Sequence, residues 1–226
     1  MNRVKNPEVT RAKILEAAFA EFYRYGFQGG SLNRIVKDAG ATKGSLFHHF
    51  DGKNALGYAV VDELLYGAAN EEWFKPLRAS SDPIAEIKRI VNAMGQRVAG
   101  EGRMLCLGCP INNLAQEMSP LDKGFQKRLS RIYDDWRGSV ATAFKNGIKS
   151  GTVRKDVAPR AVAALLVATF AGLAGTVKNA QSPDLFQEIK KGLFGYLDSL
   201  KLRHNIPSGR SEHRNPIAEC HPQEAG

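Results

Sequence analysis

Cysteine is scarce in this sequence. The 226 residues include three cysteines, Cys106, Cys109 and Cys220. Three cysteines at such uneven spacing do not form the disulfide framework that holds small secreted domains together. The beginning of the chain, up to Arg11, also lacks the apolar stretch that a secretory signal needs. We therefore expect a cytoplasmic protein.

Long hydrophobic runs are almost as scarce. The one extended uncharged run, from Ala161 to Val177, is rich in Ala and Gly, and it is shorter than the roughly twenty apolar residues of a membrane-spanning helix. No convincing alternation of apolar and polar residues predicts a strand, and no internal repeat is apparent. These absences predict an all-α fold and argue against a membrane partner.

Acidic residues are outnumbered by basic ones. The chain has 32 Lys and Arg against 23 Asp and Glu, a formal net charge of +9 and a pI of about 9.5. Residues 1–56 share this excess, with nine basic and five acidic residues. An excess of positive charge favours a polyanionic partner such as a nucleic acid.

The stretch from Ser31 to Phe50 predicts a short helix, a tight turn and a second short helix. Ser31 is suited to cap the first helix. The apolar residues of that helix recur at helical spacing and are Leu32, Ile35, Val36 and Ala39. Gly40 follows at the point where a residue with a left-handed backbone ends a helix.

The second of these helices carries small polar side chains. Thr42 is its expected cap. Its polar face consists of Lys43, Ser45 and His48. Leu46 and Phe47 turn away from that face, and we expect Leu46 and Phe50 in the core. Two short helices around a glycine turn form a helix-turn-helix, which lays its second helix in the major groove of DNA.

These residues also resemble a known family signature. The run from Ala41 to Phe50, ATKGSLFHHF, with Lys53 and Leu56 after it, closely resembles the signature of the TetR family of transcriptional regulators. In that family the run reads small residue, Ser or Thr, Lys, Gly, hydroxyl residue, Leu, Tyr or Phe, two polar or aromatic residues, and Phe. The usual Tyr is Phe47 here, so a phosphate contact through that hydroxyl is absent.

The resemblance covers residues 10–56 and implies two domains. Residues 1–56 are the expected DNA-binding domain, with the helix-turn-helix at 31–50. Residues 57–203 are the expected effector-binding and dimerisation domain, and the polar segment 204–226 is expected to be disordered. The implied function is a one-component regulator, a repressor that binds a palindromic operator in double-stranded DNA as a homodimer. A small-molecule effector, unidentified from the sequence, or thiol modification releases it.

Residues near the start of each DNA-binding helix are the candidates for contact with the operator. Thr10 and Arg11 lie near the start of the first helix, within reach of a phosphate, and Lys53 lies in the first turn of a later one. The full predicted set is Thr10, Arg11, Ser31, Thr42, Lys43, Gly44, Ser45, Phe47, His48 and Lys53.

Capping and glycine signals place the remaining helices. Four of the expected helices cover residues 7–25, 83–100, 159–179 and 183–202. Another is capped by Asp51 and ends near Trp73. A short helix begins at Pro110, and a long one runs from Ser119-Pro120 to Gly151. The helices over 159–179 and 183–202 are the expected dimer interface, since small residues allow close approach of helices. The interface candidates are Ala164, Ala168, Gly172, Gly175, Leu193 and Leu197.

The pair Cys106-Leu-Gly-Cys109 has several interpretations. Its spacing suits a redox pair or half of a metal site, but no βαβ pattern accompanies it and a zinc site would require two further ligands. Both thiols can equally be small buried side chains. If Pro110 begins a helix, Cys109 caps it, and the helix dipole favours the thiolate. Thiol sensing is then a hypothesis, while a thiol oxidoreductase and a helical adaptor without DNA binding are alternative functions.

Large apolar side chains in the second half supply candidates for an effector pocket. They are Trp73, Phe74, Met94, Met104, Met118, Trp136 and Phe170. Residues of this kind at helical spacing are equally consistent with an ordinary core. No motif indicates catalysis, a cofactor or a metal ion.

Overall fold

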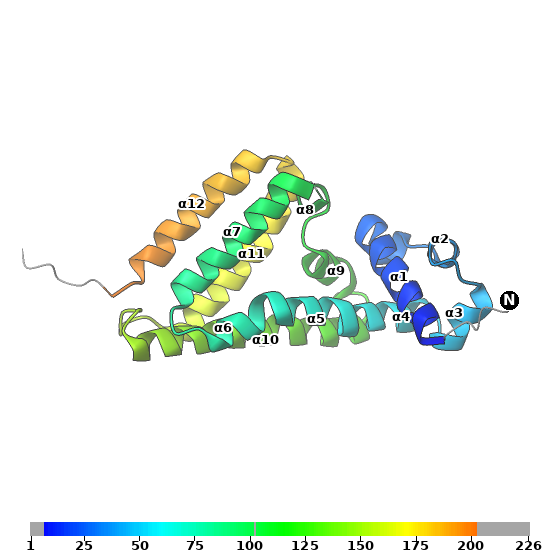
Figure 1. Cartoon of the computed structure of the whole chain (residues 1–226), viewed down its shortest axis with the longest axis horizontal. Helices are drawn as coiled ribbons and strands as arrows, with labels where there is room; N and C mark the ends of the chain where they lie inside the picture. Colours follow the sequence, from blue (N-terminus) through cyan, green and yellow to red (C-terminus); the bar gives the residue numbers. More distant parts are fainter. Residues whose placement is uncertain (1–6, 102, 203–226) are drawn as a thin grey trace, which may run out of the picture.

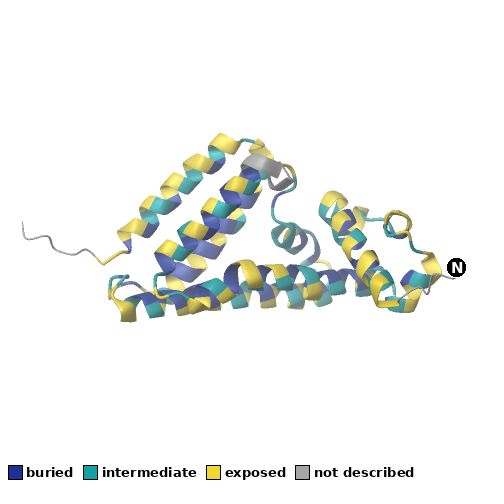
Figure 2. Cartoon of the chain, viewed as in Figure 1, coloured by how far each residue is buried: buried dark blue, intermediate teal, exposed yellow. Residues whose placement is uncertain are grey.

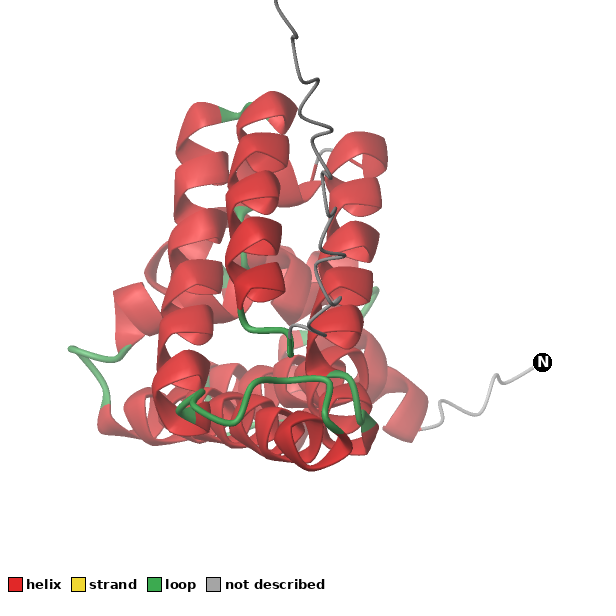
Figure 3. Ribbon diagram, turned by 90° about the vertical axis from the view of Figure 1, so that its left-hand side faces the viewer, coloured by secondary structure: helices red, strands yellow, loops and turns green. Residues whose placement is uncertain are grey.

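The computed structural model describes residues 7–101 and 103–202. Over these residues the chain is a set of helices joined by short loops, and the only β-type pairing is an isolated bridge between Val153 and Lys201 (Figure 3). The elements in order are α1 (Pro7–Gly29), α2 (Leu32–Asp38), α3 (Lys43–His49), α4 (Lys53–Ala59), η1 (Val60–Leu65), α5 (Tyr66–Ala69), η2 (Asn70–Phe74), α6 (Lys75–Ala79), α7 (Pro83–Glu101), α8 (Arg103–Leu107), α9 (Pro110–Met118), α10 (Lys123–Ser150), α11 (Pro159–Ala180) and α12 (Pro183–Ser199). The predicted all-α fold class is confirmed.

Helices α1 to α4 form a small unit at one end of the molecule (Figure 1). The predicted apolar stripe of α1 is its buried face, with Ile14 and Ala18 fully buried and Phe22 nearly so. The helix breaks at Gly26, whose φ of 76° is a conformation that glycine adopts without steric cost. Phe27, immediately after the break, is buried against Phe125 of α10, with 4.6 Å between the ring centroids.

A single continuous helical segment joins this unit to the rest of the chain. It consists of α4, η1, α5, η2 and α6, so the chain stays helical from Lys53 to Ala79, with two stretches wound as π-helix. The predicted end near Trp73 was too early, because Phe74 and Leu77 continue the buried face and are fully enclosed. Figure 1 shows this segment running alongside α10.

The remaining helices form a bundle above α10 (Figure 1). Helices α7, α11 and α12 rise together from the α10 layer, with buried residues on their facing sides and exposed residues outside (Figure 2). Among the described helices, α11 alone is long and apolar enough to cross a membrane by length and composition. Its Leu166, Phe170 and Val177 are buried inside this chain, as in the core helix of a globular domain.

Two predicted helix starts were wrong. The start of α4 is capped at Gly52, with φ 96°, and not by the side chain of Asp51. Helix α10 begins at Lys123 rather than at Ser119-Pro120, because the Asp122 carboxylate accepts the free Phe125 N–H at 2.9 Å. A second carboxylate contact, from the Tyr58 hydroxyl at 2.8 Å, also ties Asp122 to α4.

Candidate nucleic-acid interface and cavity

The helix-turn-helix is built by the predicted local signals. Ser31 occupies the N-cap position of α2, although its side chain makes no capping bond. Gly40 has φ 60° in the turn, and the Thr42 hydroxyl oxygen accepts the Ser45 N–H at 3.1 Å. Leu46 is 1% exposed and anchors α3 to the domain core. The opposite side of α3 is therefore presented to solvent.

The solvent-facing side of α3 carries Lys43, Gly44, Phe47 and His48, and Ser45 is half-buried. The prediction that Phe47 turns away with Leu46 was wrong, because Phe47 is 53% exposed on the same side of the helix as Lys43. Lys43 and Phe47 lie four residues apart, which places them on the same face of the helix. Both border a shallow groove between α2 and α3. A basic group and an apolar ring thus lie side by side on the exposed surface of this helix.

Arg11 is held by residues of its own chain. Its guanidinium donates to both carboxylate oxygens of Glu63, at 2.8 and 2.5 Å, and lies 5.1 Å from the centroid of the Phe50 ring. The hydrogen bond that Arg11 donates to Glu63, together with the negative charge of that carboxylate, raises the pKa of Arg11. This bidentate pair joins α1 to η1, so Arg11 connects the helix-turn-helix unit to the long linking segment. Thr10 is half-buried beside it.

Lys53 is also held by its own chain. Its ammonium donates to the Gln28 carbonyl at 3.1 Å and lies 5.0 Å from the Phe27 ring centroid. Burial lowers the pKa of this lysine, since desolvation disfavours its charged form. In this conformation Lys53 connects the start of α4 to the end of α1.

A buried carboxylate, Glu21, was missed at the sequence level. Glu21 is 5% exposed and accepts the Ser31 N–H and the Arg34 Nε–H, each at 2.8 Å. Burial alone would raise its pKa, but the bonds from Arg34 and Ser31 outweigh burial and lower it. The signal was present, because Glu21 falls three residues after Ala18 on the apolar stripe of α1.

A cavity of about 270 Å³ lies where the larger helical part of the chain meets α1. Its walls come from α1, the linking segment, α7, the α8–α9 connection, α10 and α11. The lining residues are Tyr23, Leu65, Ala68, Ala69, Glu72, Trp73, Met94, Arg97, Gly108, Cys109, Pro110, Ile111, Trp136, Phe170 and Ala174. Four of the predicted pocket residues therefore lie together, whereas Phe74 and Met118 are core residues outside the lining. The Met104 side chain lies outside the described part.

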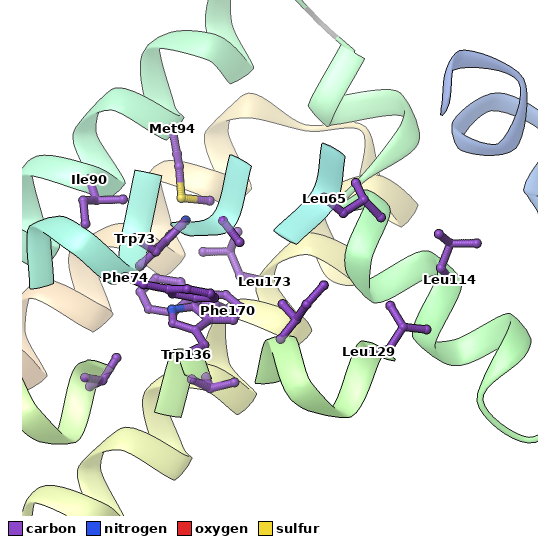
Figure 4. Close-up of a cluster of buried hydrophobic side chains, with 14 of the residues drawn as sticks. Leu65, Trp73, Phe74, Ile90, Met94, Leu114, Leu129, Trp136, Phe170 and Leu173 are labelled. Carbon is purple, nitrogen blue, oxygen red and sulfur yellow. The ribbon is translucent and has the colours of Figure 1, made fainter. Parts of the chain in front are cut away.

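Three aromatic rings form one wall of the cavity (Figure 4). Trp73 lies edge-on to Trp136, with 4.9 Å between centroids, and edge-on to Phe170, with 4.7 Å. Trp136 and Phe170 are nearly parallel, at an interplanar angle of 13°. At the rim, Arg97 donates to the Glu72 carboxylate at 2.7 and 3.2 Å. The wall is thus aromatic and the charged groups at the rim neutralise each other.

The two described cysteines differ in exposure. Cys109 is the N-cap residue of α9, as predicted, and half-buried at the cavity. Burial raises the pKa of its thiol despite the nearby backbone N–H groups of Asn112 and Ile111, so the expected thiolate is disfavoured. Cys106 is exposed. Within residues 7–101 and 103–202 no group of three metal-ligating side chains occurs, and Cys220 lies outside them.

Helix α9 connects the cavity to α1. The Tyr23 hydroxyl donates to the Gly108 carbonyl at 2.5 Å, just before α9 begins. At the far end of α9, the Glu117 carboxylate accepts the N–H groups of Phe27 and Gln28, at 2.9 and 2.8 Å. Those N–H groups are free because the α1 backbone breaks at Gly26. The sequence carries no local signal for these contacts, since their partners are distant along the chain.

The exposed surface of α11 carries the predicted small residues. Ala164, Ala168, Gly172 and Gly175 are all exposed. A Cβ atom built at either glycine would meet no neighbouring atom. The expectation for Leu193 and Leu197 was wrong, since both are buried within this chain, on the helix that packs against α7. Their apolar face fills the core and is not available to a second subunit.

These features define a class of protein. A helix-turn-helix unit, a continuous helix and a helical domain with an internal cavity are the parts of a one-component DNA-binding regulator. The family model for bacterial regulatory proteins of the tetR family matches residues 14–60, and a model for the tetracyclin repressor-like C-terminal domain matches residues 83–193. The chain belongs to the TetR family of bacterial transcriptional regulators.

Individual relatives agree with this assignment. The chain is 27% identical to the HTH-type transcriptional repressor DhaR of a Mycobacterium species, over 72% of this chain and 79% of that protein. It is 26% identical to the HTH-type transcriptional regulator TtgR of Pseudomonas putida, over 85% of this chain and 92% of that protein. The crystal structure of a TetR transcriptional regulator from Chloroflexus aurantiacus has the same fold, with a TM-score of 0.76 at 22% sequence identity. The match covers 87% of this chain and 98% of that one.

Proposed function

We propose that the protein is a cytoplasmic, homodimeric repressor that binds a palindromic DNA operator and is released when a small molecule occupies the cavity. One observation carries this proposal: the cavity shares a wall with α1, through Tyr23. A ligand there contacts the DNA-binding unit directly. The repressor relative DhaR supports the sign of regulation.

For DNA contact, the exposed side chains of α3 are the proposed reading residues. Lys43 and His48 can donate to base edges, and Phe47 can contact an apolar group in the groove. Thr42 and Gly44 at the start of α3, with Thr10 and Ser31 nearby, are proposed to contact the phosphate backbone. Arg11 and Lys53 contact phosphate in this proposal only if they exchange their internal partners.

The proposed release step uses α9 as the connection. A ligand that displaces the α8–α9 connection at Gly108 and Cys109 also moves Glu117, which holds the backbone of α1. Movement of α1 changes the spacing of the two α3 helices in a dimer, and an operator fits only one such spacing. The ligand therefore lowers the population of the DNA-competent state. No catalytic step is part of this function.

The proposed dimer forms through α11 and α12. The exposed small-residue surface of α11 allows another helix to approach closely, and Leu165 adds an apolar side chain that is 50% exposed. Gly192 and Gly195 leave the neighbouring surface of α12 equally open. In the proposed dimer, α11 and α12 of one subunit pack against α11 and α12 of its partner. This arrangement allows the two α3 helices, one from each subunit, to contact the same operator.

The test is selection of bound sequences from random duplex DNA by the full-length protein. We expect a palindrome whose half-sites lie one helical turn of about 34–36 Å, or a multiple of it, apart. Lys43→Ala should weaken binding to the selected site by about 1–3 kcal/mol and relax the preference at one base pair. Recovery of no bound duplex would contradict a regulator and favour a helical adaptor without DNA binding.

Exposure of Cys106 supports thiol modification as a second mode of release. The test is operator binding by the wild type and by a Cys106→Ser, Cys109→Ser double variant, with and without a thiol-reactive quinone. We expect reaction at Cys106 first, because Cys109 is half-buried with a raised pKa. Full operator affinity after modification of both thiols, verified by mass spectrometry, would leave the cavity ligand as the only mode of release.

A further inference from the structure

An ion pair lies between two hollows of the molecule. The inner hollow is the cavity of about 270 Å³, and the outer one is a groove of about 540 Å³ along η2 and α7. Glu72 and Arg97 line both hollows. The Arg97 guanidinium donates to the two carboxylate oxygens of Glu72, at 2.7 and 3.2 Å. The pair therefore lies at the boundary between the groove and the cavity.

The two hollows differ in polarity. The cavity is lined mainly by apolar side chains, among them the rings of Trp73, Trp136 and Phe170. The groove is lined mainly by charged and polar side chains, among them Arg89 and Gln96. An apolar molecule gains free energy by moving from the groove into the cavity, because the cavity removes its surface from water. The ion pair stands on the route between the two hollows.

This ion pair can open at small cost. The side chain of Arg97 is 42% exposed and that of Glu72 is 46% exposed. A pair in contact with water is weak, because both charges stay hydrated when they separate. The two residues also belong to different elements, η2 and α7, so a small movement of either one separates them. The pair therefore closes the boundary without locking it.

We propose that the Glu72–Arg97 ion pair is a gate through which an uncharged, apolar ligand passes from the groove into the cavity. The pair opens to admit the ligand and closes behind it, so no charge is left buried without a partner. This inference rests on the proposed function, because it supplies the entry route for the effector assumed there.

Cys109 can report on the gate, because it lies in the cavity wall. In a Cys106→Ser, Cys220→Ser background it is the single cysteine of the full-length protein. The probe is N-ethylmaleimide, a small uncharged reagent whose adduct is followed by mass spectrometry, and a pH series gives the rate constant of the thiolate. If the reagent must pass the gate, Arg97→Gln should raise that rate constant about two- to fivefold, as expected for the loss of an exposed ion pair.

The direction of this change separates the gate from an electrostatic effect on the thiol. Burial and the charge of Glu72 raise the pKa of Cys109. Removing Arg97 leaves that charge uncompensated, which by itself would slow the reaction at a fixed pH. Arg89→Gln is the matched control, because Arg89 lines the groove and pairs with Glu86, and it should react at the background rate. The double variant Glu72→Arg, Arg97→Glu restores a pair of reversed polarity and should return the rate toward the background value.

Salt gives a test that requires no substitution at the gate. Raising the ionic strength from about 0.05 to 1 M screens an exposed ion pair, so the background protein should react faster and Arg97→Gln should change little. A thermal melt by circular dichroism verifies that Arg97→Gln is folded. An unchanged rate in Arg97→Gln, an equal rise in Arg89→Gln, a double variant as fast as Arg97→Gln, or a salt-independent background rate would each overturn the proposal.

Naphthalene, an uncharged hydrocarbon of two rings, tests entry of the ligand and separates this inference from the proposed function. Saturating naphthalene should protect Cys109 from N-ethylmaleimide, and undiminished reaction would contradict entry of an apolar ligand. A gel shift on the same samples then measures operator binding. Protection of Cys109 with unchanged operator affinity supports the gate and contradicts the release step, whereas protection with weakened operator binding supports both.

Discussion

At the scale of single residues, the DNA-binding unit depends on charged groups turned inward. Glu21 receives hydrogen bonds from the start of α2, through the Ser31 N–H and Arg34, and Arg34 also lies 4.6 Å from the Tyr25 ring centroid. A buried carboxylate with two donors holds α2 at a fixed position on α1. The packing of the helix-turn-helix on α1 therefore depends in part on an ionised Glu21.

This dependence gives a pH prediction. The pKa of Glu21 is lower in the folded protein than in the unfolded chain, where it is about 4.3. Its contribution to stability is thus complete above that unfolded value and is lost as the pH falls toward the folded value. Glu21→Gln, which cannot ionise, should unfold with a weaker pH dependence between about pH 5 and 3 than the wild type.

Urea denaturation across this pH range measures the difference. Glu16→Gln on the exposed side of α1 is the matched control and should keep the wild-type slope. Equal slopes for Glu21→Gln and the wild type would contradict an ionised Glu21 in the folded protein.

Phe47 gives a second prediction at this scale. We expect its exposed ring to contact the 5-methyl group of one thymine in each half-site. Replacing that thymine by uracil removes one methyl, worth about 0.8 kcal/mol or roughly a fourfold loss of affinity. Phe47→Ala should bind both operators equally, and Phe47→Tyr should still distinguish them. Gel shifts with operators in which each thymine is replaced in turn by uracil measure this contact. If Phe47→Ala still prefers thymine over uracil as strongly as the wild type does, the contact is excluded.

At the scale of elements, α9 is the part that joins the cavity to the DNA-binding unit. Its first residues line the cavity, and its Glu117 accepts two N–H groups that the break at Gly26 leaves free. A Cβ at Gly26 would lie 3.0 Å from the Glu117 carboxylate, and the φ of 76° at this position also favours a glycine. The kink at Gly26 and the carboxylate of Glu117 together form the contact that joins α1 to α9, two helices that are distant along the chain.

Removing this contact should change hydrogen exchange at the amides that it holds. In Glu117→Ala we expect faster hydrogen exchange at the amides of Phe27 and Gln28, and a loss of about 1–2 kcal/mol in the free energy of unfolding. Glu117→Gln keeps one acceptor oxygen and should show a smaller effect. Amide exchange followed by NMR or mass spectrometry measures this. Unchanged exchange at both amides would mean that the carboxylate does not hold α1 in solution.

At the scale of the whole molecule, the exposed face of α11 differs from its buried face in side-chain size. Leu166 and Phe170 face the core, while Ala164, Ala168 and Gly172 face solvent. The solvent side is apolar and made mostly of small side chains, which suits close contact with a second helix of the same kind. Dimerisation is the assembly that this face favours.

Arginine at the centre of this face is the test of the dimer. Ala168→Arg would bury two unpaired charges across the twofold axis, at a cost of about 3–5 kcal/mol, so the dimer should dissociate at least roughly a hundredfold more readily. Ala20→Arg, at an exposed position of α1, is the control. Sedimentation at micromolar concentration reports the assembly, and a dimeric Ala168→Arg would place the interface elsewhere.

Local interactions explain what could be predicted from the sequence. The Thr42 cap and the turn at Gly40 involve atoms within a few residues of one another, so the amino-acid pattern determines them before any tertiary contact forms. The same holds for the glycine end of α10 at Gly151, with φ 80°, and the cap of α12 by Ser182. The helix-turn-helix and the all-α fold were therefore readable in advance, together with the family.

Only the tertiary structure decided which side chains face one another. Arg11 and Lys53 have the sequence positions of phosphate contacts, yet distant partners, Glu63 and the Gln28 carbonyl, bind them in this structure. Leu193 has the spacing of an interface residue, but α7 covers that face. The cavity wall joins three rings from helices far apart in the chain, among them Trp73 and Trp136. Helical periodicity indicates that a face is apolar, whereas its partner depends on how the helices pack.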